Sequence, residues 1–221
     1  MNFPDGLLPS SWQWFAHLLF VAALAWSVRA APWRRLRDNE QLHLFLGMCV
    51  ALMVLWSIKT GIRPGLNFHL LGATVFTLMF GPWLAIVGMG IVLLGVTLYG
   101  LSGWASFSVN GLLMDVLPVA ISYSLYRLAD SRLPNHFFVY IFVNAFIGAA
   151  FAMALTGLAA TGVLALAGAY TVDYLTSNYL PYFLLMGWSE ALLSGMMLTL
   201  LVVYRPQWVA TFDDVRYLRN K

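Results

Sequence analysis

Long apolar stretches alternate with short polar ones along almost the whole chain. Most of the apolar stretches are long enough for an α-helix that crosses a bilayer, which needs roughly 20 residues. The longest of them is divided at Gly81-Pro82, because proline cannot donate a hydrogen bond to the preceding turn. The pattern therefore predicts seven membrane-spanning helices, at about residues 12–28, 41–58, 67–80, 83–99, 107–128, 137–166 and 179–203.

The composition is that of a membrane protein. Hydrophobic residues make up 61% of the 221 positions and charged residues only 10%, against about 45–50% and about 25% in soluble domains. We therefore expect an all-α, polytopic membrane protein with a seven-helix bundle as a single integral membrane domain, residues 1–221. Cys49 is the only cysteine, so neither an intrachain disulfide nor a multi-cysteine metal site is expected.

Residues 1–11 form a loop before the first span. Pro4, Asp5-Gly6 and Pro9 favour turns, and the apolar residues among them favour burial, so we expect the loop to fold back into the bundle. No basic region precedes the first apolar stretch and no small-residue cleavage site follows it. The sequence therefore predicts an uncleaved start with a free α-amino group on Met1.

Positive charge is segregated between alternate loops. With seven spans, ten of the 12 Lys and Arg residues lie on one side of the membrane, and only Lys59 and Arg63 lie on the other. An excess of Lys and Arg marks cytoplasmic segments, so we expect the N-terminus outside and residues 204–221 to form a cytoplasmic tail. Because the basic residues flank the lipid bilayer, the net charge of +3 does not indicate nucleic-acid binding.

Two carboxylates, Asp115 and Glu190, lie within predicted spans. A buried acid in a membrane protein marks a pathway, a pair or a relay, and a hydrogen-bonded structural acid is an equally good interpretation. The sequence contains no HExxH, GxSxG, P-loop or dinucleotide-binding motif, so we expect no enzyme activity. The remaining enzyme hypothesis is an intramembrane site built from His69, Asp115 and Glu190.

His69 stands at the polar start of the third apolar stretch, two residues after Asn67. It is either an interface histidine bonded to backbone or water, or a ligand in a site within the bundle. The expected topology brings it to the same membrane face as the N-terminus. An α-amino group beside an imidazole favours Ni(II), Cu(II) or Co(II) over Mg or Ca.

Four segments, in order, resemble blocks of one known family. MNFPDGLLP at the start is similar to its MHIPDGFL-type opening, and HLLGATVFTLMFGPWLAI, residues 69–86, is similar to its HLTGG…LLGPWAA block. SVNGLLMDVLP around Asn110 and WSEALLSGMMLTLLVVYRPQW with Glu190 resemble its GANVFNM and EGLxTA…RP blocks. This is the CbiM/NikM family, the membrane substrate-binding subunits of energy-coupling-factor transporters for cobalt and nickel.

The resemblance implies a seven-helix fold and a metal site made of the N-terminal amine, the residue at position 2 and the histidine of the second block. In this sequence these are Met1, Asn2 and His69, with Asn67 and Asn110 as site neighbours. Position 2 departs from the family pattern, which has a histidine there. An amide oxygen is a poorer ligand for nickel or cobalt than an imidazole nitrogen.

The resemblance also implies a metal-uptake component in the inner membrane of a bacterium. Ni or Co is the transported substrate, and no tightly bound cofactor is expected. Because the sequence has no ATPase motif, a coupling membrane subunit and ATPase subunits are the expected partners. The alternative, favoured by Asn2, is a relative that has lost cobalt and nickel binding and handles another metal or a small solute, or serves in membrane-protein assembly.

Overall fold

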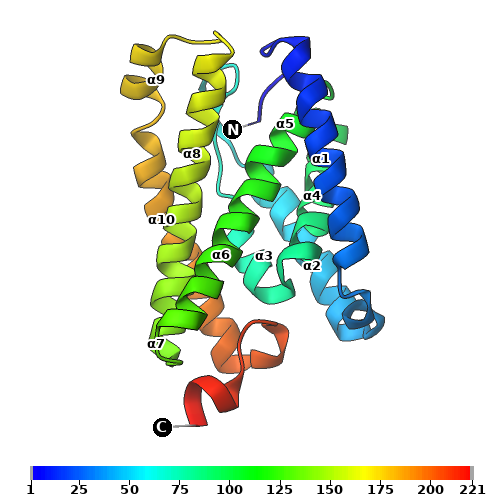
Figure 1. Cartoon of the computed structure of the whole chain (residues 1–221), viewed down its shortest axis with the longest axis vertical. Helices are drawn as coiled ribbons and strands as arrows, with labels where there is room; N and C mark the ends of the chain where they lie inside the picture. The colour runs from blue at the N-terminus through cyan, green and yellow to red at the C-terminus, as the bar shows by residue number, and fades with distance from the viewer. Residues whose placement is uncertain (1, 220–221) are drawn as a thin grey trace.

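Helices make up nearly all of the architecture in the computed structural model, which describes residues 2–219 (Figure 1). Within this range, five helical segments are long and apolar enough to cross a membrane: α1 (Ser10–Ala30), α2 (Asn39–Ser57), Phe107–Arg132, Phe137–Leu166 and α10 (Tyr182–Tyr204). A further apolar helix, α4 (Pro82–Leu98), is shorter. These segments lie close to six of the seven expected spans, and the chain is an all-helical membrane protein apart from one small hairpin.

Two of the long segments contain a wider, π-helical stretch. The first is built from α5 (Phe107–Gly111), η2 (Leu112–Val116) and α6 (Leu117–Arg132), and the second from α7 (Phe137–Val139), η3 (Tyr140–Ile147) and α8 (Gly148–Leu166). In the first, Pro118 follows the π-helical stretch closely. Proline lacks an N–H and its ring clashes with the carbonyl four residues earlier, so a wider turn relieves the conflict.

The expected span at residues 67–80 is helical only in its second half. Its first residues form strand β2 (Leu66–Phe68), which pairs antiparallel with β1 (Thr60–Arg63), where only a loop was expected. Helix α3 (Ala73–Phe80) has eight residues, so it is about 12 Å long and crosses less than half of a bilayer core. Gly72 and Gly81 bound it with positive φ angles of 66° and 81°, which end the helical path on both sides.

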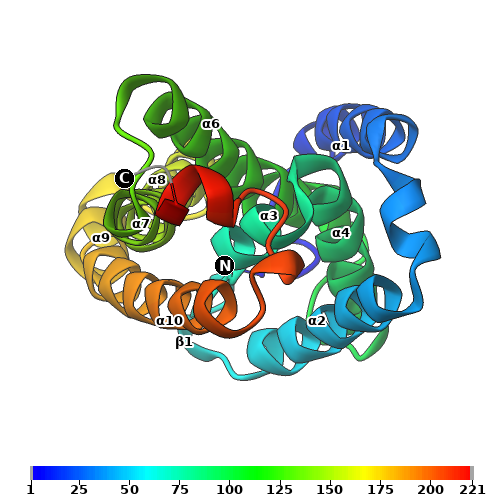
Figure 2. The same cartoon turned by 90° about the horizontal axis from the view of Figure 1, so that it is seen from below.

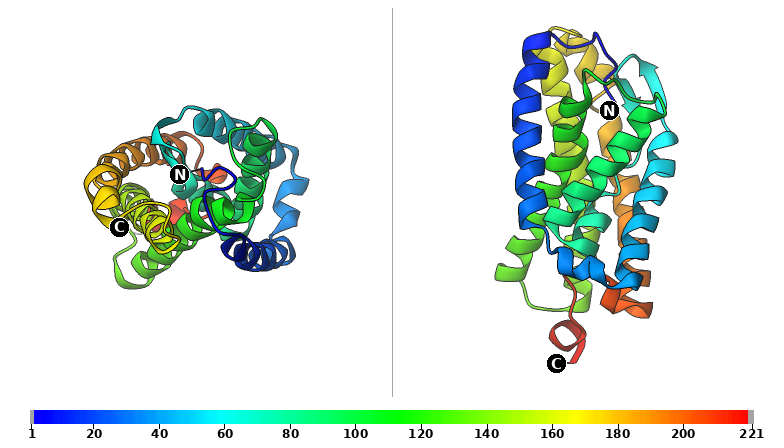
Figure 3. Two further views of the ribbon diagram at one scale, coloured as in Figure 1. Left: turned by 90° about the horizontal axis from the view of Figure 1, so that it is seen from above. Right: turned by 90° about the vertical axis from the view of Figure 1, so that its right-hand side faces the viewer.

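Helix α3 lies near the middle of the molecule. Seen from below, α2, α4, α6, α8 and α10 lie around it (Figure 2), and all eight of its residues are buried. The view from above shows the N-terminal segment, in dark blue, entering the middle of the same ring of helices (Figure 3). The short helix is therefore the central element of the bundle, beneath the N-terminal segment.

Small residues let α8 and α10 approach closely. Gly187 on α10 lies against the backbone of α8, because a Cβ added there would lie 3.3 Å from the carbonyl oxygen of Ala150. A Cβ added to Gly157 would lie 2.1 Å from the ring of Phe183 on α10, so a larger residue has no room there. This contact is typical of helix packing inside membranes.

Short elements complete the two ends of the bundle. Turn η1 (Trp33–Arg37) lies between α1 and α2, and the short helix α9 (Val172–Asn178) lies in the expected loop before α10. After α10, the chain continues through η4 (Pro206–Trp208) to η5 (Val215–Arg219). This final segment lies at the opposite end of the long axis from the loop that precedes α1 (Figure 1).

Candidate metal site

Two asparagine side chains hold the backbone of the N-terminal segment. Asn67 accepts a hydrogen bond from the backbone N–H of Asn2 (2.8 Å) and donates to its carbonyl (3.1 Å). Asn110 makes the same pair of bonds with Phe3, at 2.8 and 3.1 Å. A carboxamide has the donor and acceptor arrangement of a peptide group, so the two side chains act on residues 2 and 3 as a neighbouring strand would.

The residues that follow are anchored to the turn before α5. The Asp5 carboxylate accepts hydrogen bonds from the backbone N–H groups of Trp104 (3.2 Å), Ala105 (2.8 Å) and Ser106 (3.2 Å). Gly103 allows this approach, because a Cβ at that position would lie 2.2 Å from the Asp5 side chain. The segment is therefore fixed at residues 2, 3 and 5, and Phe3 is completely buried.

The side chains of Asn2 and His69 meet inside the bundle, and each residue is only 2% exposed. Asn2 Oδ1 lies 3.0 Å from His69 Nε2, and His69 Nδ1 lies 3.0 Å from the carbonyl oxygen of Leu70. A neutral imidazole carries one N–H and can donate to only one of these oxygens. Donation from Nδ1 to Leu70 leaves Nε2 as the nitrogen that faces residue 2.

The Asn2 amide fits that assignment only after a half-turn of the group, because Oδ1 and an unprotonated Nε2 would otherwise be two acceptors facing each other. Its Nδ2 atom is buried without a hydrogen-bond partner. Amide oxygen and nitrogen positions are interchangeable by a half-turn of the group. The half-turn places Nδ2 against the Nε2 lone pair of His69, so that both groups gain a partner. Nε2 is then the His69 atom available to a metal ion.

A second layer of contacts fixes the loop that carries His69. The Trp56 ring lies 5.3 Å from the His69 ring, centre to centre, and its indole N–H donates to the carbonyl of Leu71 (3.0 Å). Glu190 on α10 accepts hydrogen bonds from the backbone N–H groups of Leu71 (2.8 Å) and Gly72 (2.6 Å). These are the donors at the start of α3, where a helix leaves N–H groups unpaired and favours a negative charge.

An open cavity of about 590 Å³ lies outside the site. Asn2 lines the cavity and also contacts the imidazole, so it lies between the cavity and His69. The cavity wall also contains Lys59, whose ammonium group donates to the Leu101 carbonyl at 2.6 Å. Partial burial lowers the pKa of Lys59 from its usual value. The cavity therefore extends from the outside of the bundle to Asn2.

The remaining expected site residues divide into two groups. Met1 lies outside the described residues, and so does its amine. Asp115 is buried in η2, and neither of its carboxylate oxygens has a hydrogen-bond partner; it takes no part in the contacts around His69. Within residues 2–219, no group of three His, Cys, Asp or Glu side chains could hold a metal ion.

Sequence reasoning missed Trp56 and the partners of Glu190, although a hydrogen-bonded structural acid was one of its two interpretations. Trp56 lies in the middle of an apolar run, where a tryptophan carries no signal beyond packing. Glu190 stood out as a buried acid, but its partners are backbone N–H groups about 120 positions earlier, and backbone donors have no sequence signature.

Comparison with known proteins places these features in context. The family model CbiM, described as the cobalt uptake substrate-specific transmembrane region, matches residues 2–208. Cobalt transport protein CbiM of Salmonella typhimurium is 27% identical over 58% of this chain and 53% of its own length. Putative cobalt transport protein CbiM 2 of Methanosphaerula palustris is 24% identical over 92% of this chain and 86% of its own.

Other relatives are longer, and solved structures share the fold. The probable fused nickel transport protein LarMN of Lactiplantibacillus plantarum is 24% identical over 72% of this chain and 48% of its own length. The chain spans about half the length of several curated relatives it matches. A crystal structure of a truncated transition metal transporter, 20% identical, superposes with a TM-score of 0.79 over 92% of this chain and 99% of that one.

Proposed function

This chain belongs to the CbiM family of cobalt uptake transmembrane proteins, and we propose that it binds cobalt or nickel at an outward-facing site as the first step of uptake. The observation that carries the proposal is the contact of residue 2 with His69 Nε2 at 3.0 Å, in a segment held by two asparagine side chains. Members of the family are transport proteins, so the intramembrane-enzyme hypothesis has no support.

The proposed ligands are the Met1 amine, His69 Nε2 and groups of Asn2. An amine and an imidazole suit Ni(II) and Co(II), and a neutral nitrogen is the form that binds metal. The Asn2 backbone nitrogen now donates its proton to Asn67 Oδ1. To become a ligand it has to release that proton to solvent as the metal binds, which breaks its hydrogen bond to Asn67 Oδ1.

The proposed topology has seven membrane segments with the N-terminus outside. The extended chain from β2 to Gly72 together with α3 supplies the third segment, because α3 alone is too short to cross, and α4 supplies the fourth. Transport against a gradient needs energy, and the sequence has no ATPase motif. We therefore assign the chain the metal-binding role beside a coupling membrane subunit and ATPase subunits in the inner membrane of a bacterium.

Asn2 supports a second candidate function. An amide in place of an imidazole weakens a nickel or cobalt site. In this second candidate the protein binds neither metal and handles another metal or a small solute instead. The two candidates differ in one measurable property, which is the affinity of the protein for Ni(II) and Co(II).

Calorimetric titration of Ni(II) and Co(II) into protein with a free Met1 amine tests the proposal. His69→Ala should abolish binding, and so should one residue added before Met1, because each removes a nitrogen ligand. Asn2→His should tighten binding by restoring an imidazole. Binding should weaken below neutral pH, since the amine has to lose a proton from a reference pKa of about 7.7–8.0.

His43→Ala is the matched control, because His43 lies exposed on α2 away from the site. It should bind both metals as the unchanged protein does. If the unchanged protein binds neither metal and Asn2→His confers no binding, the cobalt and nickel proposal fails and the second candidate takes its place.

A further inference from the structure

The C-terminal tail, residues 205–219, is bonded to the end of α3. Ala210 donates its N–H to the carbonyl of Met79 (3.0 Å). Thr211 donates its N–H (3.3 Å) and its hydroxyl (2.8 Å) to the carbonyl of Leu78. These carbonyls belong to the last turn of α3, where a helix has no donors of its own. The tail supplies the missing donors.

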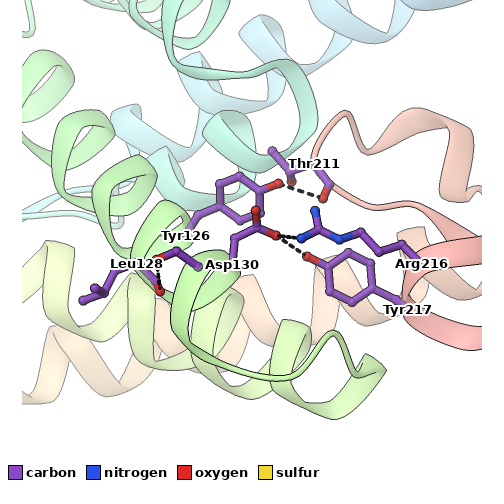
Figure 4. A network of polar contacts seen from close by, with 7 residues as sticks. Tyr126, Leu128, Asp130, Thr211, Arg216 and Tyr217 are labelled. Atoms are coloured by element: carbon purple, nitrogen blue, oxygen red, sulfur yellow. Dashed lines mark hydrogen bonds and ion pairs between the residues drawn. The ribbon is translucent and has the colours of Figure 1, made fainter. Parts of the chain in front are cut away.

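A second set of bonds fixes the tail to the surrounding helices. Figure 4 shows those made by Asp130 and by Tyr126, whose hydroxyl donates to the Thr211 carbonyl (3.3 Å). The Tyr140 hydroxyl lies 2.6 Å from the Thr211 hydroxyl; Thr211 donates to Leu78, so Tyr140 is the donor in this pair. Asp130, near the end of α6, forms an ion pair with Arg216 (2.7 Å) and accepts a hydrogen bond from Tyr217 (3.3 Å). Thr211 thus joins the end of α3 to the helices around it.

The other end of the same helix belongs to the candidate metal site. Glu190 holds the backbone N–H groups of Leu71 and Gly72, which follow the His69 loop and lead directly into α3. Eight helical residues separate the two ends, a distance of about 12 Å. The loop with His69 and the C-terminal tail are therefore attached to opposite ends of one short, rigid element.

We propose that the C-terminal tail controls the metal site through α3, so that a tail bonded to Leu78 and Met79 favours the arrangement in which His69 meets residue 2. The inference rests on the proposed function, because it assigns His69 to metal binding. Helix α3 has two positions. In the first, the tail is bonded to α3 and His69 meets residue 2; when the tail is freed, the second position, without the contact between His69 and residue 2, is favoured.

The packing of α3 explains why the two ends respond together. All eight residues are buried. If the tail leaves, the carbonyls of Leu78 and Met79 lose their donors and no water replaces them, which costs free energy until the helix shifts. The glycines at both ends, with positive φ angles, let the flanking chain change direction while the helix moves as a unit. Coupling between two sites requires such a shared element, and it is reciprocal.

The test combines calorimetry with hydrogen–deuterium exchange on the purified full chain with a free Met1 amine. Thr211→Val removes the hydroxyl that bonds Leu78 and Tyr140. It should raise amide exchange at residues 71–80 as well as in the tail, and weaken Co(II) or Ni(II) binding about fivefold or more, the lower end of ordinary coupling. Co(II) should in turn slow amide exchange in the tail of the unchanged protein.

Asp130→Asn is the milder second variant, because it removes only the ion pair with Arg216 and should shift both readouts less, in the same direction. Thr176→Val on α9 is the matched control and should shift neither, since that hydroxyl bonds only its own helix. If tail exchange rises while exchange at residues 71–80 and metal affinity stay unchanged, the coupling is overturned.

The coupling and the proposed function fail separately. If the unchanged protein binds neither metal, metal uptake is wrong, while amide exchange at residues 71–80 in the Thr211→Val protein still decides whether the tail holds α3. If that variant does not fold, Asp130→Asn decides the same question. The inference is then overturned if amide exchange at residues 71–80 stays the same as in the unchanged protein.

Discussion

Individual polar residues do more in this bundle than the sequence indicates. Asn67 and Asn110 stood out as polar neighbours of a possible site, but their pairing with the backbone of residues 2 and 3 depends on how distant segments meet. Asp5 looked like a turn residue and in fact binds three backbone N–H groups near the start of α5. A side chain that pairs with backbone leaves no pattern in a sequence, so only the candidate residues could be predicted.

Glu190 offers a test at the scale of one residue. Both of its oxygens accept backbone N–H groups that follow His69. In Glu190→Gln the amide keeps one acceptor and turns a donor toward the other N–H, so one buried bond is lost. The loss of a buried partner costs about 1–3 kcal/mol, and we expect a lower unfolding temperature together with weaker Co(II) or Ni(II) binding.

Ser189→Ala is the control for that substitution, because Ser189 is the exposed neighbour of Glu190 and bonds only its own helix. Thermal unfolding in detergent and calorimetry measure the two effects. Metal affinity and unfolding temperature that both match those of the unchanged protein would show that Glu190 does not position the His69 loop.

At the scale of elements, the apolar pattern predicted the long helices well and the third one poorly. A bilayer-length apolar run has a simple physical requirement, and the helices at both ends of the sequence meet it. The run before Gly81 is apolar because α3 and the strand before it are buried in protein, and burial in protein and burial in lipid select the same residues. Its division into a hairpin, an extended loop and a short helix depends on partners that are distant in sequence, such as Glu190 and Thr211.

Gly81 tests the importance of that division. Its φ of 81° and ψ of 167° lie in a region that is essentially restricted to glycine, and a Cβ added there would meet no atom within 4 Å. Gly81→Ala therefore has a purely conformational cost of about 1–3 kcal/mol. We expect a lower unfolding temperature and, because α3 is displaced, faster amide exchange at residues 71–80.

Gly47→Ala provides the matched control within a helix. Gly47 lies inside α2 with an ordinary negative φ, and a Cβ added there would also meet no atom within 4 Å. Alanine at this position should therefore be neutral or stabilising by about 0.5–1 kcal/mol. If the two alanine variants unfold at the same temperature, the sharp end of α3 is not a constrained feature of the fold.

At the scale of the whole molecule, family membership agrees with what four short sequence blocks implied. The blocks lie at the start, in the middle and near the end of the chain, and the fold brings all four together, since Asn110 from the third binds the backbone of Phe3 from the first. Asn2 from the first meets His69 from the second, and Glu190 from the fourth holds the loop of the second. Their order along the chain indicated the family, whereas their contacts required the three-dimensional structure.

The two ends of the molecule differ in charge, and this difference predicts its orientation in the membrane. The N-terminal segment enters the bundle at one end of the long axis and the tail extends from the other (Figure 1). Ten of the 12 Lys and Arg residues fall on the tail side when the chain has seven segments. Because cytoplasmic segments carry the excess of positive charge, a reporter fused after Lys221, a position outside the described residues, should report the cytoplasm.

A second reporter, inserted in the turn at Gly168 between α8 and α9, should report the outer side, because one membrane segment separates this turn from the tail. The pair distinguishes orientation from segment number. A tail reporter outside and a Gly168 reporter inside would mean that the molecule has the opposite orientation. The Asn2–His69 contact would then lie on the cytoplasmic face, where it could receive no metal from outside. Reporters on the same side would remove the seven-segment topology, since α10 would then fail to cross. Only opposite sides, with the tail inside, agree with the proposed outward-facing site.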